Sequence, residues 1–367
     1  MNKVFLLLFL VFFQAIQVFG FSEKIDTKLE HIVQKLVNEG AIPGANIGIW
    51  VPQKGQWLGS FGVANKITKE ALTLKHYFRI GSVSKTFVGT SILQLVDKEK
   101  LSLDDKISKY VKNVPNGDKI TIRHLGNMTS GLPNYSEDKE FEAGIREVWT
   151  SESLLKFAFK NPVEFEPGEK FHYSNTNTVL LGLVIKKVSG LSVDKYIEKN
   201  IIKPLNLKNT FYPLNENMPF PYAHGYTKQT PNNEEEDSSM WNPSWTNAAG
   251  QMISTLEDLR IWTEALGTGK LLSKKSYEEM KKWGTVPPNT NERKYGFTIG
   301  YNYGWLYHTG ELPGYNTVIS YLPENGAVVV VMVNTDSHIK SKKEKIAPVI
   351  KIFSEVAKLL FPDHIPK

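Results

Sequence analysis

The order of strand-like and helical sequence along this 367-residue chain is the feature that most limits its fold. Segments rich in β-branched and aromatic residues lie near both ends, whereas helical segments joined by Pro, Gly and Asn loops fill roughly residues 100–285. The segments with strand character are 46–51, 56–63, 295–301, 305–308, 315–322 and 327–333. The sequence therefore predicts an α+β fold in which both ends of the chain build one antiparallel sheet.

Two amphipathic segments, 25–39 and 346–360, predict helices that flank this sheet at the N- and C-terminal ends of the chain. We expect a discontinuous sheet domain of residues 24–95 and 286–362, with residues 96–285 as a large, mostly helical inserted domain. A cleft between the two layers is the expected place for a ligand.

The N-terminus has the pattern of a signal peptide spanning residues 1–20. A short basic start is followed by an unbroken apolar run, Val4 to Phe13, and cleavage is expected after Gly20. The alternative is an uncleaved anchor, but the apolar run is too short to cross a bilayer without Gln14 and Gln17. We expect an exported protein, periplasmic or secreted, with no stable membrane anchor after cleavage.

Composition excludes several classes of chemistry. The chain has no cysteine, which removes thiol nucleophiles, thiolate zinc sites and disulfides. None of its eight histidines forms an HExxH-type pair, so we expect no metal and no cofactor. The net charge of +6 is mildly basic, but no recognition helix or aromatic RNA-binding motif accompanies it, and no nucleic-acid partner is expected.

Ser82 and Lys85 form the first candidate catalytic pair. Strand-like residues 77–80 give way to a helix after Gly81, and residues three apart share a helix face, so the hydroxyl and the amine can touch. A desolvated lysine can take the serine proton, and unpaired N–H groups at the helix start favour developing negative charge. Ser84 is the capping alternative.

The Ser-x-x-Lys spacing alone is weak evidence, because a surface helix pair gives the same pattern. It also occurs at Ser136/Lys139, Ser153/Lys156, Ser192/Lys195 and Ser337/Lys340. The strand, glycine and helix around Ser82 set it apart.

Tyr173-Ser174-Asn175 precedes an apolar helix and follows a Pro-Gly turn. A phenol that meets a lysine ammonium can have its pKa lowered and act as a general base, and Asn175 can donate to a substrate amide. The alternative is a helix-capping loop with a core tyrosine.

His308-Thr309-Gly310 ends a predicted strand. A cation at position 308 would steer a substrate carboxylate or support the tyrosine, and the glycine would let a substrate lie against the backbone. As an isolated tripeptide this segment is uninformative.

Taken together, these motifs resemble the serine β-lactamase and penicillin-binding-protein superfamily, most closely class C β-lactamases and D-alanyl-D-alanine carboxypeptidases. The matching segments are 78–85, 124–125 with 129–133, 167–168 with 171–175, and 308–310 with 313–315. The resemblance covers about residues 25–355.

The resemblance implies a role for each residue. Ser82 would be acylated, Lys85 and Tyr173 would shuttle its proton, and Tyr173 would later activate the deacylating water. The backbone N–H groups of Ser82 and Glu311 would form the oxyanion hole. Asn175, His308, Thr309 and Gly310 would bind the substrate, with His308 standing where relatives carry Lys or His.

Glu311 limits the choice of substrate, because relatives specialised for β-lactams or D-alanyl peptides often carry Ser or Thr at this position, beside the substrate carboxylate. Two carboxylates about 5 Å apart at an effective dielectric of about 20 repel by roughly 3 kcal/mol. The sequence leaves open whether the Glu311 side chain faces the cleft or points away.

Three functional hypotheses follow. The first is an exported serine hydrolase that acts through an acyl-enzyme on peptide or amide bonds, D-alanyl-D-alanine-carboxypeptidase-like, with a small-molecule or peptide substrate such as a cell-wall peptide. The second keeps the chemistry in a class C-like β-lactamase or a small-ester esterase. The third is a non-catalytic penicillin-binding or sensor protein.

Overall fold

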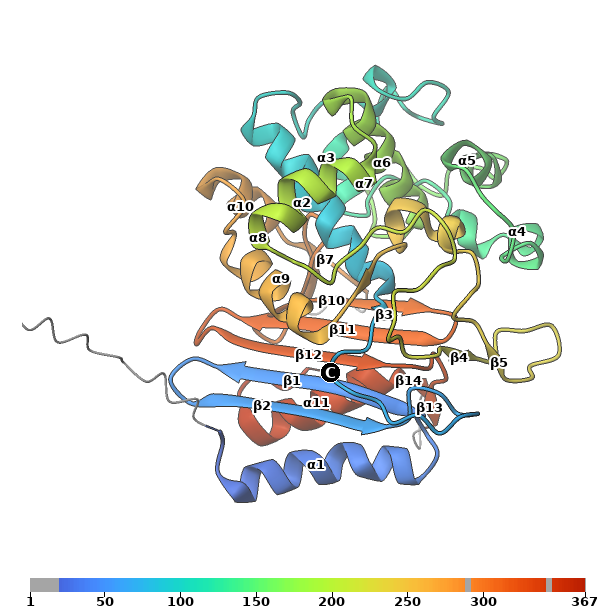
Figure 1. Cartoon of the computed structure of the whole chain (residues 1–367). Helices are drawn as coiled ribbons and strands as arrows, with labels where there is room; N and C mark the ends of the chain where they lie inside the picture. Colours follow the sequence, from blue (N-terminus) through green and yellow to red (C-terminus); the bar gives the residue numbers. More distant parts are fainter. Residues whose placement is uncertain (1–19, 288–291, 341–344, 367) are drawn as a thin grey trace, which may run out of the picture.

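The computed structural model describes residues 20–287, 292–340 and 345–366, and an antiparallel sheet lies at its centre (Figure 1). Within these residues the sheet has eight strands in the order β2-β1-β12-β11-β10-β9-β8-β7. Their bounds are β1 Gly44–Val51, β2 Gly55–Gly62, β7 Gly284–Thr285, β8 Arg293–Tyr295, β9 Gly300–Asn302, β10 Trp305–Leu312, β11 Tyr315–Leu322 and β12 Ala327–Val333. The two ends of the chain meet where β1 pairs with β12, Ala45 opposite Val333. The predicted α+β fold with a sheet built from both ends is confirmed.

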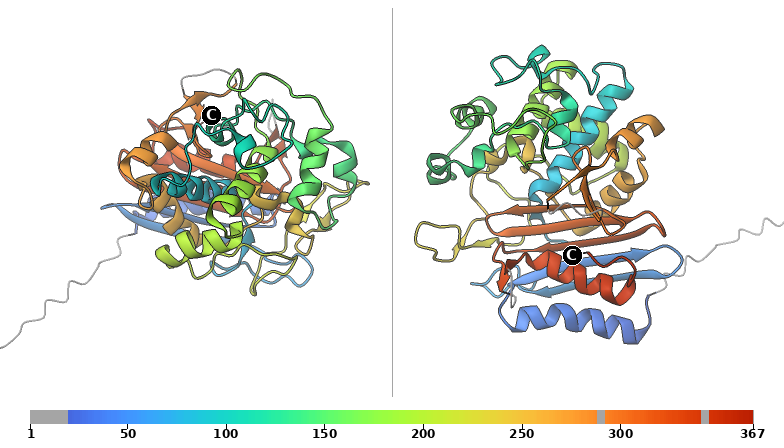
Figure 2. Two further views of the ribbon diagram at one scale, coloured as in Figure 1. Left: turned by 90° about the horizontal axis from the view of Figure 1, so that it is seen from above. Right: turned by 180° about the vertical axis from the view of Figure 1, so that it is seen from behind.

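One face of the sheet is covered by α1, Glu23–Asn38, and α11, Pro348–Leu360 (Figure 2). Alternate residues of β12, including Val329 and Val331, join the apolar core beneath these helices. The residues between them, including Val330, join the larger core on the other face. This alternation explains why β12 is an unbroken apolar run: both of its faces are covered.

The helical layer lies on the opposite face of the sheet (Figure 1). Its longer helices are α2 Ser84–Asp97, α6 Asn175–Ser189 and α9 Leu256–Thr268, and its shorter ones are α3 Ile122–Gly126, α4 Lys139–Ala143, α5 Ser151–Phe159, α7 Val193–Ile197, α8 Lys203–Leu205 and α10 Lys274–Met280. Helix α2 runs through the middle of this layer and is buried from Ser84 to Leu95. The ring of Phe87 stacks on Trp262 with 3.8 Å between centroids, and Trp262 Nε1 donates to Thr86 Oγ1 over 2.9 Å. These contacts fix the helix that follows Ser82.

The structure corrects the expectation of a single strand over 295–301. Thr298 has φ +58°, which reverses the chain between β8 and β9. The backbone N–H of Phe297 donates to Met280 O, and that of Thr298 donates to Gly126 O. Tertiary hydrogen bonds to the helical layer therefore override the local strand preference.

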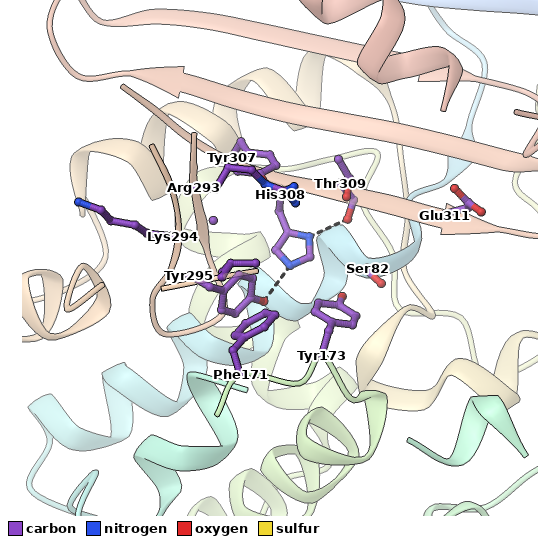
Figure 3. A pocket seen from close by; sticks show the side chains of 12 residues that line it. Ser82, Phe171, Tyr173, Arg293, Lys294, Tyr295, Tyr307, His308, Thr309 and Glu311 are labelled. Atoms are coloured by element: carbon purple, nitrogen blue, oxygen red, sulfur yellow. Dashed lines mark hydrogen bonds between the residues drawn. The ribbon is translucent and has the colours of Figure 1, made fainter. Parts of the chain in front are cut away.

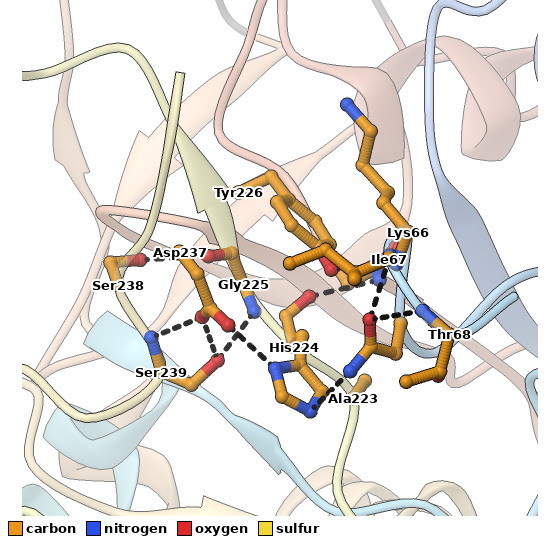
Figure 4. A network of polar contacts seen from close by, with 12 residues as sticks. Lys66, Ile67, Thr68, Ala223, His224, Gly225, Tyr226, Asp237, Ser238 and Ser239 are labelled. Carbon is orange, nitrogen blue, oxygen red and sulfur yellow. Dashed lines mark hydrogen bonds and ion pairs between the residues drawn. The ribbon is translucent and has the colours of Figure 1, made fainter. Parts of the chain in front are cut away.

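The long polar segment 213–247 is fastened to the body of the protein by side-chain hydrogen bonds (Figure 4). His224 lies between Asn65, 3.1 Å from its Nε2, and Asp237, 2.6 Å from its Nδ1. The short strands β4, Tyr226–Thr227, and β5, Glu236–Asp237, pair within this segment. The polar residues of this segment therefore form structural hydrogen bonds as well as contacts with solvent.

The predicted signal peptide lies outside the described residues except for Gly20. No helix in the described part of the chain has the length and apolar character needed to cross a membrane. The boundaries expected for the sheet and helical domains stay a prediction.

Candidate active site

Ser82 stands on a sharp turn between sheet and helix. The strand β3, Phe78–Arg79, leads into the 3-10 turn Gly81–Val83, which continues directly as α2. Gly81 has φ +51°, a conformation that side chains other than glycine rarely adopt. A Cβ atom at Gly81 would also lie 2.8 Å from the backbone nitrogen of Glu311. The glycine therefore permits both the turn and the approach of strand β10.

Lys85 is brought against Ser82, as the spacing predicts. Its Nζ lies 2.8 Å from Ser82 Oγ and donates to the carbonyl oxygen of Ala249 over 2.8 Å. The lysine side chain is fully buried, and this burial lowers the pKa of its amine well below the usual value. An uncharged amine has a lone pair that can accept the serine proton.

Tyr173 also reaches Ser82, through a hydrogen bond between the two side chains. Burial raises the pKa of the phenol above its usual value of 10, with the hydrogen bond from Ser82 opposing that effect. Lys85 Nζ lies over the ring, 4.9 Å from its centroid. The expectation of a lowered phenol pKa is wrong, because the amine beside the ring is itself desolvated, and Tyr173 keeps its proton at neutral pH.

His308 is buried behind the tyrosine and is uncharged (Figure 3). Its Nδ1 lies 2.6 Å from the carbonyl oxygen of Thr309, which can only accept, so Nδ1 carries the hydrogen. Its Nε2 then accepts from the hydroxyl of Tyr295 over 3.0 Å. Burial and the nearby Lys85 lower the pKa of His308 to about 3. The expected cation at position 308 is therefore absent at neutral pH.

The backbone N–H groups of Ser82 and Glu311 lie close together, because Gly81 and Gly310 let the two backbone segments approach each other. A Cβ atom at Gly310 would lie 3.1 Å from the nitrogen of Ser82, just as one at Gly81 would crowd the nitrogen of Glu311. Strands β10 and β11 pair Leu312 with Tyr315 across a two-residue turn. Hydrogen bonding alternates along such a ladder, so the N–H of Glu311 is turned away from β11 and toward Ser82. The two donors can receive one oxygen atom between them.

Two hollows meet at this point. The first, of about 360 Å³, is lined by Ser82, Tyr173, His308 and Thr309 together with Arg293. The second, of about 1140 Å³, is lined by Asn175 and by the acidic and basic side chains around α4. Glu311 borders both, and Figure 3 shows its side chain beyond Ser82, on the side away from Tyr295.

The remaining candidate residues lie outside the hollow that holds Ser82, and each has a different structural role. Asn175 does not line the hollow that holds Ser82, and its Nδ2 donates to Ser136 Oγ over 2.9 Å. Ser84 is fully buried, and its Oγ accepts the backbone N–H of Met252, which makes it a structural residue. Of the other Ser-x-x-Lys pairs, Ser136 supports Asn175, and Ser153 caps the helix α5 with Thr150.

Sequence reasoning missed three groups that shape the site. Tyr295 orients His308, the carbonyl of Ala249 holds Lys85, and Asn316 Nδ2 donates to Glu311 Oε2 over 2.9 Å. None lies in a recognisable motif, and a backbone carbonyl leaves no trace in the sequence. The register that pairs Glu311 with Asn316 across Pro313-Gly314 became apparent only in the structure, because no turn was predicted there.

Comparisons with known proteins agree with this geometry. The Beta-lactamase family profile matches residues 29–350. Protein flp of Staphylococcus aureus (strain MRSA252) is 32% identical over 332 residues, which cover 86% of this chain and 63% of that protein. The chain thus spans a little under two thirds of the length of this curated relative.

Two solved structures are similar over most of their length. A D-stereospecific amidohydrolase from Streptomyces sp. is 32% identical with a TM-score of 0.77, covering 85% of this chain and 94% of that one. The D-amino acid amidase from Ochrobactrum anthropi SV3, complexed with D-phenylalanine, is 27% identical with a TM-score of 0.81, covering 92% of this chain and 99% of that one. The chain belongs to the Beta-lactamase family.

Proposed function

We propose that this protein is an exported hydrolase that cleaves peptide or amide bonds at D-configured residues through an acyl-enzyme on Ser82, with chemistry like that of D-alanyl-D-alanine carboxypeptidases. The observation that carries the proposal is the distance of 2.8 Å between Ser82 Oγ and Lys85 Nζ, an amine whose pKa is lowered by burial. The amidohydrolase and the amidase of similar structure support the choice of an amide substrate with D stereochemistry. A cell-wall peptide is the expected natural partner.

Acylation uses each group in turn. Ser82 Oγ attacks the carbonyl carbon and gives its proton to Lys85 Nζ, while the carbonyl oxygen becomes an oxyanion held by the N–H groups of Ser82 and Glu311. Tyr173 donates its proton to the leaving nitrogen as the C–N bond breaks. The ammonium of Lys85 then returns a proton to the Tyr173 oxygen.

Deacylation reverses these roles. Water attacks the acyl carbonyl, its proton passes to the pair formed by Tyr173 and Lys85, and the same pair returns a proton to Ser82 Oγ as the ester bond breaks. The protonated phenol favours amide substrates, because an amine leaves poorly unless its nitrogen is protonated. Neutral His308 packs behind the phenol and holds no formal charge that would compete for the proton.

A substrate panel tests the proposal. We expect D-alanyl-D-alanine peptides or D-amino acid amides to be hydrolysed at least about 10-fold faster than their L counterparts, a difference of about 1.4 kcal/mol in transition-state binding. Released D-alanine or ammonia is measured, with the panel completed by a p-nitrophenyl ester and a chromogenic cephalosporin. The protein is taken from the culture medium and envelope fractions, where export would place it.

Two results would contradict the proposal. Rapid hydrolysis of the cephalosporin with no turnover of D-peptides or D-amides would make the protein a β-lactamase. Stable labelling by penicillin with no turnover of any substrate would make it a binding or sensor protein.

The pH profile of the same reaction reports on Lys85. The base must be uncharged, so kcat/KM is expected to be high above the lowered pKa of Lys85 and to fall as the pH drops through it. The raised pKa of Tyr173 keeps the phenol protonated, so the plateau should extend beyond about pH 10, the ordinary pKa of tyrosine. An enzyme that becomes active only near pH 10 would show that Lys85 keeps its ordinary pKa.

A further inference from the structure

The carboxylate of Glu311 lies next to the position of the reacting carbonyl. The backbone N–H of Glu311 is one of the two oxyanion donors. The side chain of Glu311 branches from the Cα atom that is bonded to this donor nitrogen. The side chain is 40% exposed and borders the hollow that contains Ser82 as well as the one that contains Asn175. Glu311 also borders a third hollow, together with Asp336 and His338, so its side chain lies where the hollows around Ser82 open to the surface.

The positions of Tyr173 and Asn175 indicate which part of a substrate meets this carboxylate. Tyr173 is the proton donor to the leaving nitrogen. Of the two hollows, Tyr173 and His308 line the smaller one and not the larger one. The leaving group therefore occupies the smaller hollow, and the acyl part of the substrate extends into the larger one. Glu311 stands at the entrance to that acyl side.

The carboxylate is held in place but keeps one oxygen for a ligand. Asn316, only 2% exposed, donates to Glu311 Oε2, and His338 Nε2 lies 3.7 Å from the same oxygen. Within the described ranges, no hydrogen bond or ion pair engages the other oxygen, Oε1. A fixed carboxylate with a vacant oxygen is suited to a cationic group.

The larger hollow, which we call the acyl-side hollow, is lined by charged side chains that are mainly negative, like that of Glu311. Acidic side chains outnumber basic ones among the residues that line it, which are Glu142, Glu147, Glu234, Glu236 and Glu311 against Lys139 and Arg146. Arg146 is paired with Glu236 at 2.8 Å and does not offset Glu311. The local field therefore favours a positively charged acyl group and disfavours a carboxylate.

We propose that Glu311 selects substrates whose acyl residue carries a free α-ammonium group, and that it discriminates against the same residue when its nitrogen is acylated. This inference rests on the proposed hydrolysis of D-amides at Ser82. In an amino acid amide the α-ammonium is bonded to the carbon adjacent to the attacked carbonyl, which puts it beside the residue that donates to the oxyanion. Selection of this kind narrows the proposed function to cleavage of D-amino acid amides or of peptides with a free D-amino terminus, and it disfavours a D-alanyl-D-alanine cell-wall peptide, whose acyl D-alanine is N-acylated.

A ratio of two substrates tests the proposal without depending on the absolute rate. The substrates are D-alanine amide and N-acetyl-D-alanine amide, and the measured quantity is the ratio of their kcat/KM values in the wild type and in Glu311→Gln. We expect the wild type to prefer the free amine, and the substitution to reduce that preference by about 10- to 100-fold, the range of a hydrogen bond to a charged group. Any disturbance of the oxyanion hole affects both substrates and cancels in the ratio.

Glu140→Gln is the matched control, because it removes one exposed carboxylate of α4 that is paired with Lys160 and lines neither hollow. We expect it to change the ratio less than about 3-fold, since a distant surface charge is screened. An equal effect of Glu140→Gln, or an unchanged ratio in Glu311→Gln, would overturn the assignment to Glu311. A wild type that hydrolyses only the N-acetylated amide would also overturn it while leaving the proposed function intact.

Failure of the proposed function gives a different result. In that case neither amide is hydrolysed, and the same ratio is measured with D-alanine methyl ester and N-acetyl-D-alanine methyl ester. A preference for the free amine that disappears in Glu311→Gln would then support the selection by Glu311 alone, and its absence would refute it.

Discussion

Ser82→Ala is expected to reduce kcat by a factor on the order of 10⁴ to 10⁶, the range seen when a catalytic serine is removed from a serine hydrolase. Without the hydroxyl there is no atom to form the acyl bond, and Lys85 has no proton to accept. Intact mass after exposure to a penicillin measures the same step directly. The wild type should gain the mass of the drug, persistently if deacylation is slow and transiently if it is fast, and the variant should gain none.

Ser84→Ala is the matched control, two residues away in the same motif. Ser84 Oγ accepts the backbone N–H of Met252, so its loss leaves a buried donor unpaired and is expected to cost about 1–3 kcal/mol of stability. The folded fraction should still form the penicillin adduct. If the adduct still forms in Ser82→Ala but is lost in Ser84→Ala, the assignment of the nucleophile to Ser82 is wrong.

Gly310→Ala is expected to have the second largest effect. The added Cβ would lie 1.9 Å from the carbonyl oxygen of Ile80 and 3.1 Å from the nitrogen of Ser82. Both contacts are with backbone atoms, so strand β10 and the turn that carries Ser82 must move apart. We expect a loss of about 1–3 kcal/mol of stability from overpacking. We also expect a fall in kcat of about 10²- to 10³-fold, comparable to the loss of one oxyanion donor.

Chemical denaturation and steady-state kinetics measure the two effects separately. Gly284→Ala in β7 is the control, because its Cβ would meet no atom nearer than 3.6 Å. It is expected to leave both quantities within experimental error. A Gly310→Ala enzyme with normal kcat would show that strand β10 does not contribute to the oxyanion hole.

The fold was largely predictable from the sequence because its main elements have strong patterns. The fully apolar run of β12 and the amphipathic periods of α1 and α11 are specified by residues within each element. The split between β8 and β9 was not predictable, since it depends on hydrogen bonds to Met280 and Gly126 in distant parts of the chain. Local preference decides an element only where no such tertiary bond competes.

The candidate site was predictable to the extent that its chemistry lies in motifs. Ser82, Lys85 and Tyr173 come together, whereas Asn175 lies in the neighbouring hollow. The protonation states were harder to predict, because burial depends on the whole fold. Desolvation lowers the pKa of Lys85 and raises the pKa of Tyr173, so the two groups shift in opposite directions.

Segment 213–247 supplies no group that lines the hollow around Ser82, but it anchors both sides of the oxyanion hole. Arg79, three residues before Ser82, donates to the carbonyl of Ser239, and Ser238 Oγ donates to the carbonyl of Pro313 in the turn after Glu311. The spacing of the two oxyanion donors is thus set by neighbouring residues of one surface loop. Changes at Ser238 or Ser239, which line neither hollow, can accordingly alter the rate of turnover without contacting the substrate.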